Sequence, residues 1–146
     1  MGLFQAFDIS ASGMTAERFR MDTIEQNIAN INTTRTEDGT PYRRKIVTFA
    51  EKTETPFSQY YETARARAVG NGVKVTSVKE DDETEMRMVY DPSHPDADEN
   101  GYVTYPNVNT VTEMTNLIDA TRAYEANTTA FDATKSMVQA ALNISK

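Results

Sequence analysis

The chain has 146 residues, 38% hydrophobic and 25% charged, which is the size and composition of one soluble domain. Its formal net charge of −7 opposes the electrostatic attraction that drives binding to nucleic acid or anionic lipid, so we expect neither partner. The absence of cysteine excludes disulfides, thiolate metal sites and a thiol nucleophile.

The N-terminal residues MGLFQAFD lack the basic and apolar regions of a secretory signal peptide. No apolar run in the chain approaches the ~20 residues that span a bilayer, so we expect no membrane insertion. These two observations predict either a cytoplasmic protein or one exported without a cleaved signal.

Apolar residues in the segment 4–31 recur three and four positions apart, which predicts an amphipathic helix. Glycine lowers helix stability by about 1 kcal/mol relative to alanine, so Gly13 predicts that the first two turns are separate from or looser than the rest of the helix. The turn-forming residues between 30 and 39 are expected to end the helix. The apolar stripe includes Phe7, Met14, Met21, Ile24, Ile28 and Ile31.

The middle segment has strand composition in four short runs, residues 45–49, 73–78, 86–90 and 102–105, which predicts a small antiparallel sheet. The stretch 55–68 fits either a loop or a short helix.

From residue 108 onward the chain contains neither Gly nor Pro, which predicts a single helix of up to about 50 Å. Its apolar stripe repeats every seven residues through Leu117, Tyr124, Phe131 and Val138 and is widened by residues that include Ile118 and Leu142. The fold class is therefore mixed α+β, in which long terminal helices pack as a coiled-coil-like pair around a small β-rich middle.

Two arrangements would bury the helical stripes. A helical hairpin within the chain needs no partner, whereas packing against other chains buries stripes that continue almost to both termini. Because the ends of a small monomer normally fray, stripes of this length favour packing against copies of related chains.

Residues 96–103 match the opening of a calcium loop of the EF-hand type, and a calcium-binding interaction module is one alternative function. The Glu that would close the site is replaced by Asn107, and prolines interrupt the flanking segments. An acidic turn that leads into a strand is the preferred interpretation, and we expect no metal site and no cofactor.

Other charged groups have structural explanations. His94 stands alone in a loop, without a sequence neighbour that predicts acid–base chemistry, so we expect no catalytic residue. The acidic run 80–85 is interpreted as a solvated hairpin tip. The basic run 43–45 is expected to form salt bridges at the base of the sheet or to contact an acidic neighbour.

Residues 27–30, Asn-Ile-Ala-Asn, resemble a signature near the N-terminus of bacterial flagellar rod and hook proteins, the axial family. The resemblance narrows to the proximal rod proteins through an ordered set of segments that spans nearly the whole chain. These segments are PYRRK at 41–45, GVKV at 72–75, MVYDP at 88–92, ADENGYV at 97–103, PNVN at 106–109 and ATRAYEAN at 120–127.

This resemblance implies a non-enzymatic structural subunit of the flagellar basal body, with another axial rod or hook protein as the alternative. The subunit would be exported through the flagellar type III apparatus. Its partners would be its own copies, the other proximal rod proteins, the rod adapter and the MS-ring region. Residues 1–34 and 108–146 would form one inner helical domain, and residues 35–107 would form the middle segment.

Two asparagines of the signature, Asn27 and Asn30, lie three positions apart beside apolar residues of the stripe. We expect their amides to fix the register of an otherwise apolar seam by directional hydrogen bonds. They complete the predicted set of assembly residues.

Overall fold

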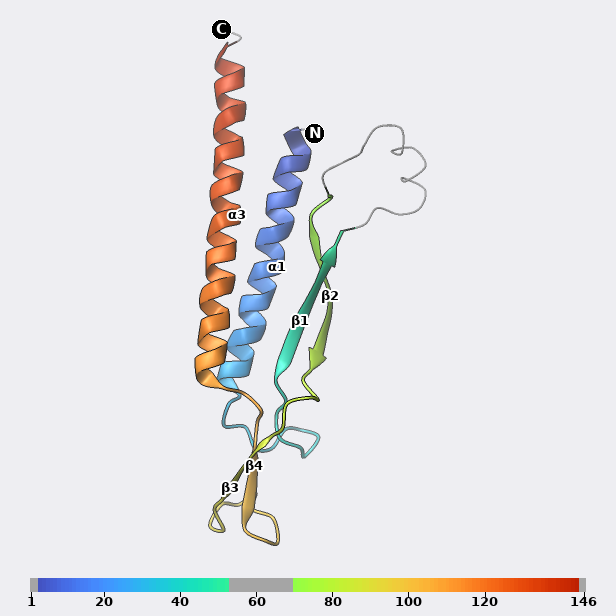
Figure 1. Cartoon of the computed structure of the whole chain (residues 1–146), viewed down its shortest axis with the longest axis vertical. Coiled ribbons are helices and arrows are strands. Elements are labelled where there is room, and N and C mark those ends of the chain that lie inside the picture. Colours follow the sequence, from blue (N-terminus) through green and yellow to red (C-terminus); the bar gives the residue numbers. More distant parts are fainter. Residues whose placement is uncertain (1–2, 53–69, 145–146) are drawn as a thin grey trace, which may run out of the picture. The chain divides into compact units, whose positions relative to one another are not determined.

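The computed structural model describes residues 3–52 and 70–144, so the ambiguous stretch 55–68 lies outside the described residues. Helix α1 (Leu3–Ala29) is followed by strands β1 (Lys45–Glu51), β2 (Val73–Glu80), β3 (Arg87–Tyr90) and β4 (Tyr102–Tyr105) (Figure 1). Helix α3 (Thr110–Ile144) completes the order. The predicted mixed α+β class, with a long helix at each end of the chain and a small β-rich middle, is confirmed.

Helix α1 continues without a break through Gly13, so its first two turns are not separate from the rest of the helix. A Cβ atom at Gly13 would lie 2.6 Å from Oδ1 of Asn127 on α3. The glycine therefore gives the Asn127 side chain room to approach the α1 backbone. This close approach offsets the low helix propensity of glycine.

The four strands form two separate two-stranded sheets, β1–β2 and β3–β4, rather than the single sheet that the sequence suggested. The Asp81 amide donates to the Arg44 carbonyl at 2.8 Å at the end of the first sheet. Beyond this bond, the Asn107 carboxamide accepts from the Arg44 amide and donates to the Asp81 carbonyl, both at 2.8 Å. Because a side chain occupies these backbone groups, the β1–β2 ladder ends here.

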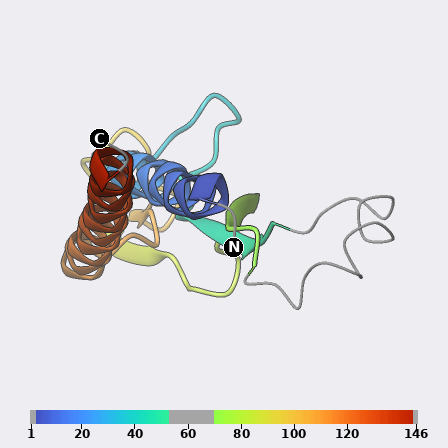
Figure 2. The ribbon, with the colours of Figure 1, turned by 90° about the horizontal axis from the view of Figure 1, so that it is seen from above.

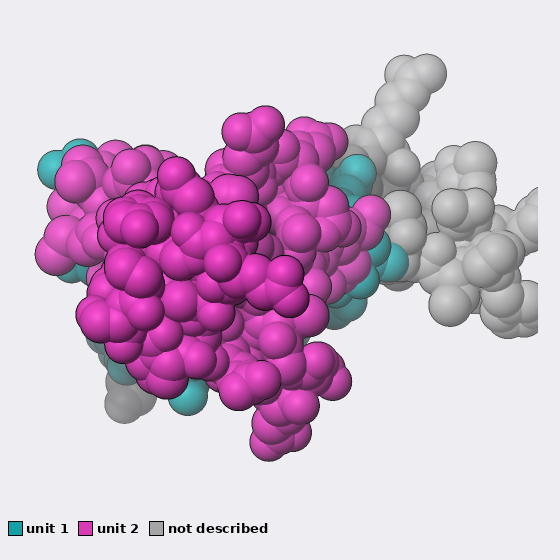
Figure 3. Space-filling view, turned by 90° about the horizontal axis from the view of Figure 1, so that it is seen from below, with its two compact units in different colours: residues 1–19, 49–76, 120–146 teal, residues 20–48, 77–119 magenta. Residues whose placement is uncertain are grey.

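The chain divides into two compact units, each assembled from separate stretches of sequence (Figure 3). Unit 1 contains residues 1–19, 49–76 and 120–146, and unit 2 contains residues 20–48 and 77–119. Both long helices and the β1–β2 strands contribute residues to each unit.

Within unit 1 the two helical segments lie side by side and run antiparallel (Figures 1 and 2). The rings of Phe7 and Phe131 meet edge to face, with their centroids 4.8 Å apart. Two turns further along α1 and one turn earlier in α3, the Thr128 hydroxyl donates to the sulfur of Met14 at 3.4 Å. Residues of the two predicted stripes thus meet within one chain, so the hairpin arrangement that the sequence analysis disfavoured is present.

Candidate assembly interface

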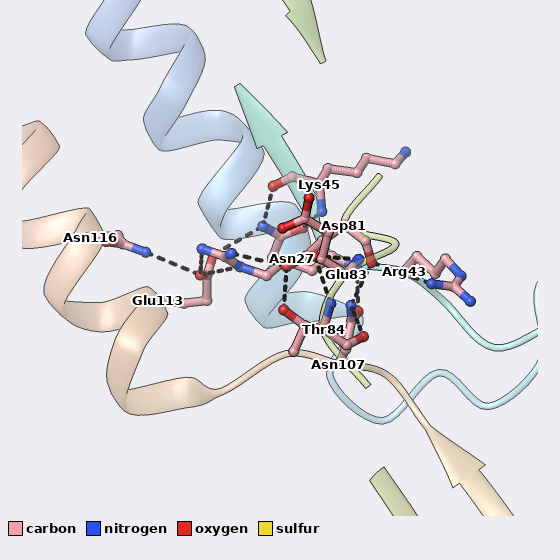
Figure 4. Close-up of polar contacts among 10 residues, drawn as sticks. Asn27, Arg43, Lys45, Asp81, Glu83, Thr84, Asn107, Glu113 and Asn116 are labelled. Atoms are coloured by element: carbon pink, nitrogen blue, oxygen red, sulfur yellow. Dashed lines mark hydrogen bonds and ion pairs between the residues drawn. The ribbon is translucent and has the colours of Figure 1, made fainter. Parts of the chain in front are cut away.

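Unit 2 contains a group of mostly buried polar side chains where the end of α1, the start of α3, the start of β1 and the end of β2 come together (Figure 4). We refer to it as the polar cluster. Two of its members, Asn27 and Glu113, are among the largest fully buried side chains of the described residues. The cluster consists of Asn27, Tyr42, Arg44, Asp81, Asn107 and Glu113.

Asn27 has no exposed surface, and all of its hydrogen-bonding groups find partners within the chain. Its Nδ2 donates to the Lys45 carbonyl at 2.9 Å and to Oε2 of Glu113 at 3.0 Å. Its Oδ1 accepts from the Lys45 amide at 2.8 Å and from the Tyr42 hydroxyl at 2.9 Å. The side-chain amide therefore pairs with Lys45 as a neighbouring strand would, and ties α1 to the start of β1.

Arg44 joins two buried carboxylates. Its Nε and Nη2 both lie 2.8 Å from Oε1 of Glu113, and its Nη1 lies 3.4 Å from Oδ2 of Asp81. Since buried charged groups need partners, these contacts offset the cost of burying the side chains of Glu113 and Asp81. The expectation that the basic run makes salt bridges at the base of the sheet is confirmed for Arg44, and also for Arg43, which lies 3.2 Å from Asp82.

Asp81 corrects the interpretation of residues 80–85 as a solvated tip, because its side chain is buried. The amide and hydroxyl of Thr84 donate to its carboxylate, and these bonds, with further donation from Arg44 and Glu83, lower the pKa of Asp81. The flanking residues 82–85 are exposed, as expected. Asp81 thus has a structural role that the acidic composition of residues 80–85 does not reveal.

Glu113 lies in the first turn of α3, where the partial positive charge of a helix N-terminus favours a carboxylate. Asn109 precedes this turn, and its Oδ1 accepts from the amides of Val111 and Thr112 at 3.0 and 3.2 Å. Glu113 is absent from the residues predicted from the sequence. The available signal was its position four residues before Leu117, which places an acidic residue in line with the apolar stripe.

Tyr42 is the aromatic member of the polar cluster. Burial, followed by the negative charges of Glu80 and Glu113, raises the pKa of its hydroxyl above the ordinary value of 10.0. The hydroxyl therefore remains a donor to Asn27 at neutral pH.

The candidate calcium loop forms the turn between β3 and β4. Oδ1 of Asp98 accepts from the amides of Asn100 and Tyr102 at 2.9 and 2.8 Å. Asp96 accepts from the Thr34 hydroxyl at 2.8 Å and lies 3.6 Å from Arg35. These carboxylates bind the chain's own donors, as the interpretation of an acidic turn leading into a strand predicts.

His94 lies in the same connection. Its Nδ1 accepts from the Asp96 amide at 3.1 Å, and its ring faces the ring of Tyr105 with centroids 6.4 Å apart. The histidine therefore holds the turn by a local hydrogen bond.

The predicted assembly residues differ widely in exposure. Ile24 and Asn27 are buried within the chain, whereas Ile118 and Leu142 are 53% and 67% exposed. Asn30 makes only local bonds, to the Gln26 carbonyl and from the Thr33 hydroxyl. It is half-buried, as are Phe7, Met14, Met21, Ile28, Ile31, Leu117, Tyr124, Phe131 and Val138.

Helix α3 also carries apolar side chains that the described part of the chain leaves uncovered. Val111, Met114 and Ile118 are 74%, 55% and 53% exposed and recur at helical spacing, so they form one stripe. Leu142 lies eleven residues after Phe131, which places it on the same side of α3 as the ring that meets Phe7. The seam of α3 therefore continues past its contact with α1 and ends exposed.

Comparison with known proteins identifies the family. Residues 7–35 match the family model described as flagella basal body rod protein, and residues 99–144 match the C-terminal model of the flagellar basal body rod FlgEFG proteins. The flagellar basal-body rod protein FlgC of Bacillus subtilis is 45% identical, over the full length of both chains. FlgC of Borreliella burgdorferi is 44% identical over 99% of this chain and 98% of its own, and FlgC of Salmonella typhimurium is 39% identical over the same shares.

The chain belongs to the FlgC family of flagellar basal-body rod proteins. It is a structural subunit of the rod in the bacterial flagellar basal body, where rod proteins assemble with one another. Among the described helices, none has a stretch that is both long and apolar enough to cross a membrane. The resemblance that the sequence segments carried is confirmed, and the alternative of a different axial protein is set aside.

Proposed function

We propose that this subunit has no enzymatic activity and polymerises through its terminal helices into the proximal rod, a shaft that transmits torque across the periplasm. The observation that supports this proposal most is the apolar surface that α3 leaves uncovered within each unit, at Val111, Met114 and Ile118 near its start and at Leu142 near its end. Exposed apolar side chains at helical spacing on a charged, soluble chain are typical of surfaces that neighbouring subunits cover.

In the proposed assembly, residues 1–34 and 108–146 form the inner helical domain, and residues 35–107 form the middle segment. The half-buried stripe residues divide their surface between the other helix of the same chain and neighbouring subunits. Asn30 is half-buried and can contact a neighbour, whereas Asn27 is fully buried and acts within the chain. The register role proposed for Asn27 therefore concerns the pairing of α1 with β1 within one subunit.

The proposed neighbours are further copies of this chain, the other proximal rod proteins, and the rod adapter and MS-ring region. The flagellar type III export apparatus would deliver the chain without a cleaved signal peptide.

The test replaces exposed apolar residues by aspartate in a strain that lacks the natural gene. Ile118→Asp and Leu142→Asp place a charge where the proposal puts an apolar contact, so we expect loss of swimming and of complete rods. Soft-agar motility and electron microscopy of isolated basal bodies provide the measurements. Because both side chains are exposed in the single chain, the purified variants should retain the natural urea-unfolding midpoint.

Thr129→Asp is the matched control, since it adds the same charge at an exposed polar position of α3. Normal motility for Thr129→Asp, together with loss for the two apolar positions, is the expected result. Straight, functional rods built from Ile118→Asp and Leu142→Asp would contradict assembly through the exposed apolar side chains of α3.

A further inference from the structure

The β3–β4 hairpin has an apolar face that no described part of the chain covers. In its register Tyr90 pairs with Tyr102 and Met88 with Thr104, so these four side chains share one face. Met88 and Tyr90 are 64% and 65% exposed and Tyr102 is 45% exposed. We refer to Met88, Tyr90 and Tyr102 as the hairpin face.

On the opposite side of the hairpin Val103 is fully buried in unit 2, whereas its partner Val89 is 37% exposed. The hairpin is therefore anchored through Val103, and the apolar side chains of the hairpin face make no contribution to that anchoring. Met and Tyr are enriched at protein interfaces, and Tyr provides a large contact area with few flexible bonds.

The hairpin face is preformed. The rings of Tyr90 and Tyr102 pack edge to face, with their centroids 5.2 Å apart. Gly101 has a φ of 80°, and a Cβ atom there would lie 3.0 Å from the Tyr90 ring, so glycine is needed both for the turn and for the ring. The Asp98 carboxylate holds the same turn through two amides. A partner that docks here pays little ordering entropy.

Negative charge is concentrated in the segment of the chain that carries this face. Residues 80–105 contain nine acidic residues and one basic residue, Arg87, whereas the rest of the chain has one more basic than acidic residue. Asp81, Asp82 and Asp96 are paired with arginines outside the segment. The other six acidic residues of the segment form no ion pair within residues 3–52 and 70–144. These six are Glu80, Glu83, Glu85, Asp91, Asp98 and Glu99.

We infer that the hairpin face is the docking surface for a basic protein other than this chain, one that presents several Lys or Arg side chains around an apolar centre. Complementary charge at the rim of an apolar contact accelerates association and selects the partner. A second copy is a poor match, because the chain outside residues 80–105 is nearly neutral. The inference rests on the proposed function, since the partner is met in the assembled basal body.

The natural chain has no cysteine, so a single introduced thiol reports on one position. Met88→Cys probes the hairpin face, and Met137→Cys probes α3, through which the chain is proposed to assemble. Met137 is the same residue type at nearly the same exposure, 63%, so the two positions can be compared directly. Each variant is labelled with a maleimide as the purified single chain and in isolated basal bodies. We expect labelling at position 88 to be at least about tenfold slower in basal bodies, because an interface centre excludes solvent.

Three further results are expected at position 88 in basal bodies. High salt, which screens rim charges, should speed labelling there and leave position 137 unchanged. Replacing Glu83, Glu85 and Glu99 together by Gln should also speed it. A thiol-to-amine cross-linker should join position 88 to a lysine of a different protein, within a basic segment identified by mass spectrometry.

The outcomes separate this inference from the proposed function. Unchanged labelling at position 88, with protection at position 137, would refute the docking surface alone. Free labelling at both positions would refute the assembly and the docking together. A cross-link from position 88 to another copy of this chain, or to a segment without basic residues, would show that the partner chemistry is wrong.

Discussion

Replacement of Asn27 by leucine tests whether the polar cluster holds α1 in place. The side chain keeps nearly the same size, but four hydrogen bonds of 2.8 to 3.0 Å are lost, to both backbone groups of Lys45, to Tyr42 and to Glu113. At about 1 kcal/mol for each bond, Asn27→Leu should lower the free energy of unfolding by about 4 kcal/mol. This loss is a large share of the roughly 5–15 kcal/mol that stabilises an ordinary domain.

The measurement is urea unfolding of the purified chain, followed by circular dichroism and by tyrosine fluorescence, since the chain has no tryptophan. Asn30→Leu is the matched control from the same sequence signature. Asn30 is half-buried and makes one bond to its own helix and one to Thr33, so its replacement should cost at most about 1 kcal/mol. Equal losses for the two variants would refute the assignment of the register role to Asn27.

Three further predictions concern the glycines and one buried acid. Gly13→Ala should lower the unfolding free energy in the natural chain but raise it by up to about 1 kcal/mol in an Asn127→Ala chain, where the obstructing side chain is gone; equal effects in both backgrounds would contradict the close approach. Gly72→Ala and Gly39→Ala both place alanine at a positive φ, at a cost of about 1–2 kcal/mol each, but only Gly72 meets another side chain and should lose more stability in the same urea assay. Because the folded state lowers the pKa of Asp81, its stabilising effect is present above the ordinary value of 3.8 and lost as pH falls through the lowered pKa; Asp81→Asn should therefore flatten the acid dependence of the urea midpoint, and an unchanged slope would contradict it.

The sequence predicted the secondary structure well where periodicity was long or alternation was clear. The heptads through Tyr124 and Phe131 predicted one helix, and α3 runs without interruption from Thr110 to Ile144. The four strand runs correspond to β1, β2, β3 and β4. These features depend on local patterns, which a single sequence contains.

What could not be predicted depends on contacts between distant residues. The pairing of Arg44 with Glu113 joins positions 69 residues apart, and a charged residue in an exposed-looking run gives no local sign of burial. The split of the sheet depends on the Asn107 carboxamide, 63 residues from Arg44. Gly13 was judged by propensity alone, because the side chain that needs its space lies on another helix.

The paired bonds between Asn27 and the peptide groups of Lys45 have a mechanical consequence. Successive residues of a helix are rotated by about 100°, so turning α1 by a single position would swing the amide away and break both bonds at once. Apolar packing alone resists such rotation weakly, because one apolar side chain can take the place of another in a non-directional contact. The amide therefore locks the rotational setting of α1 against the start of β1 within one subunit.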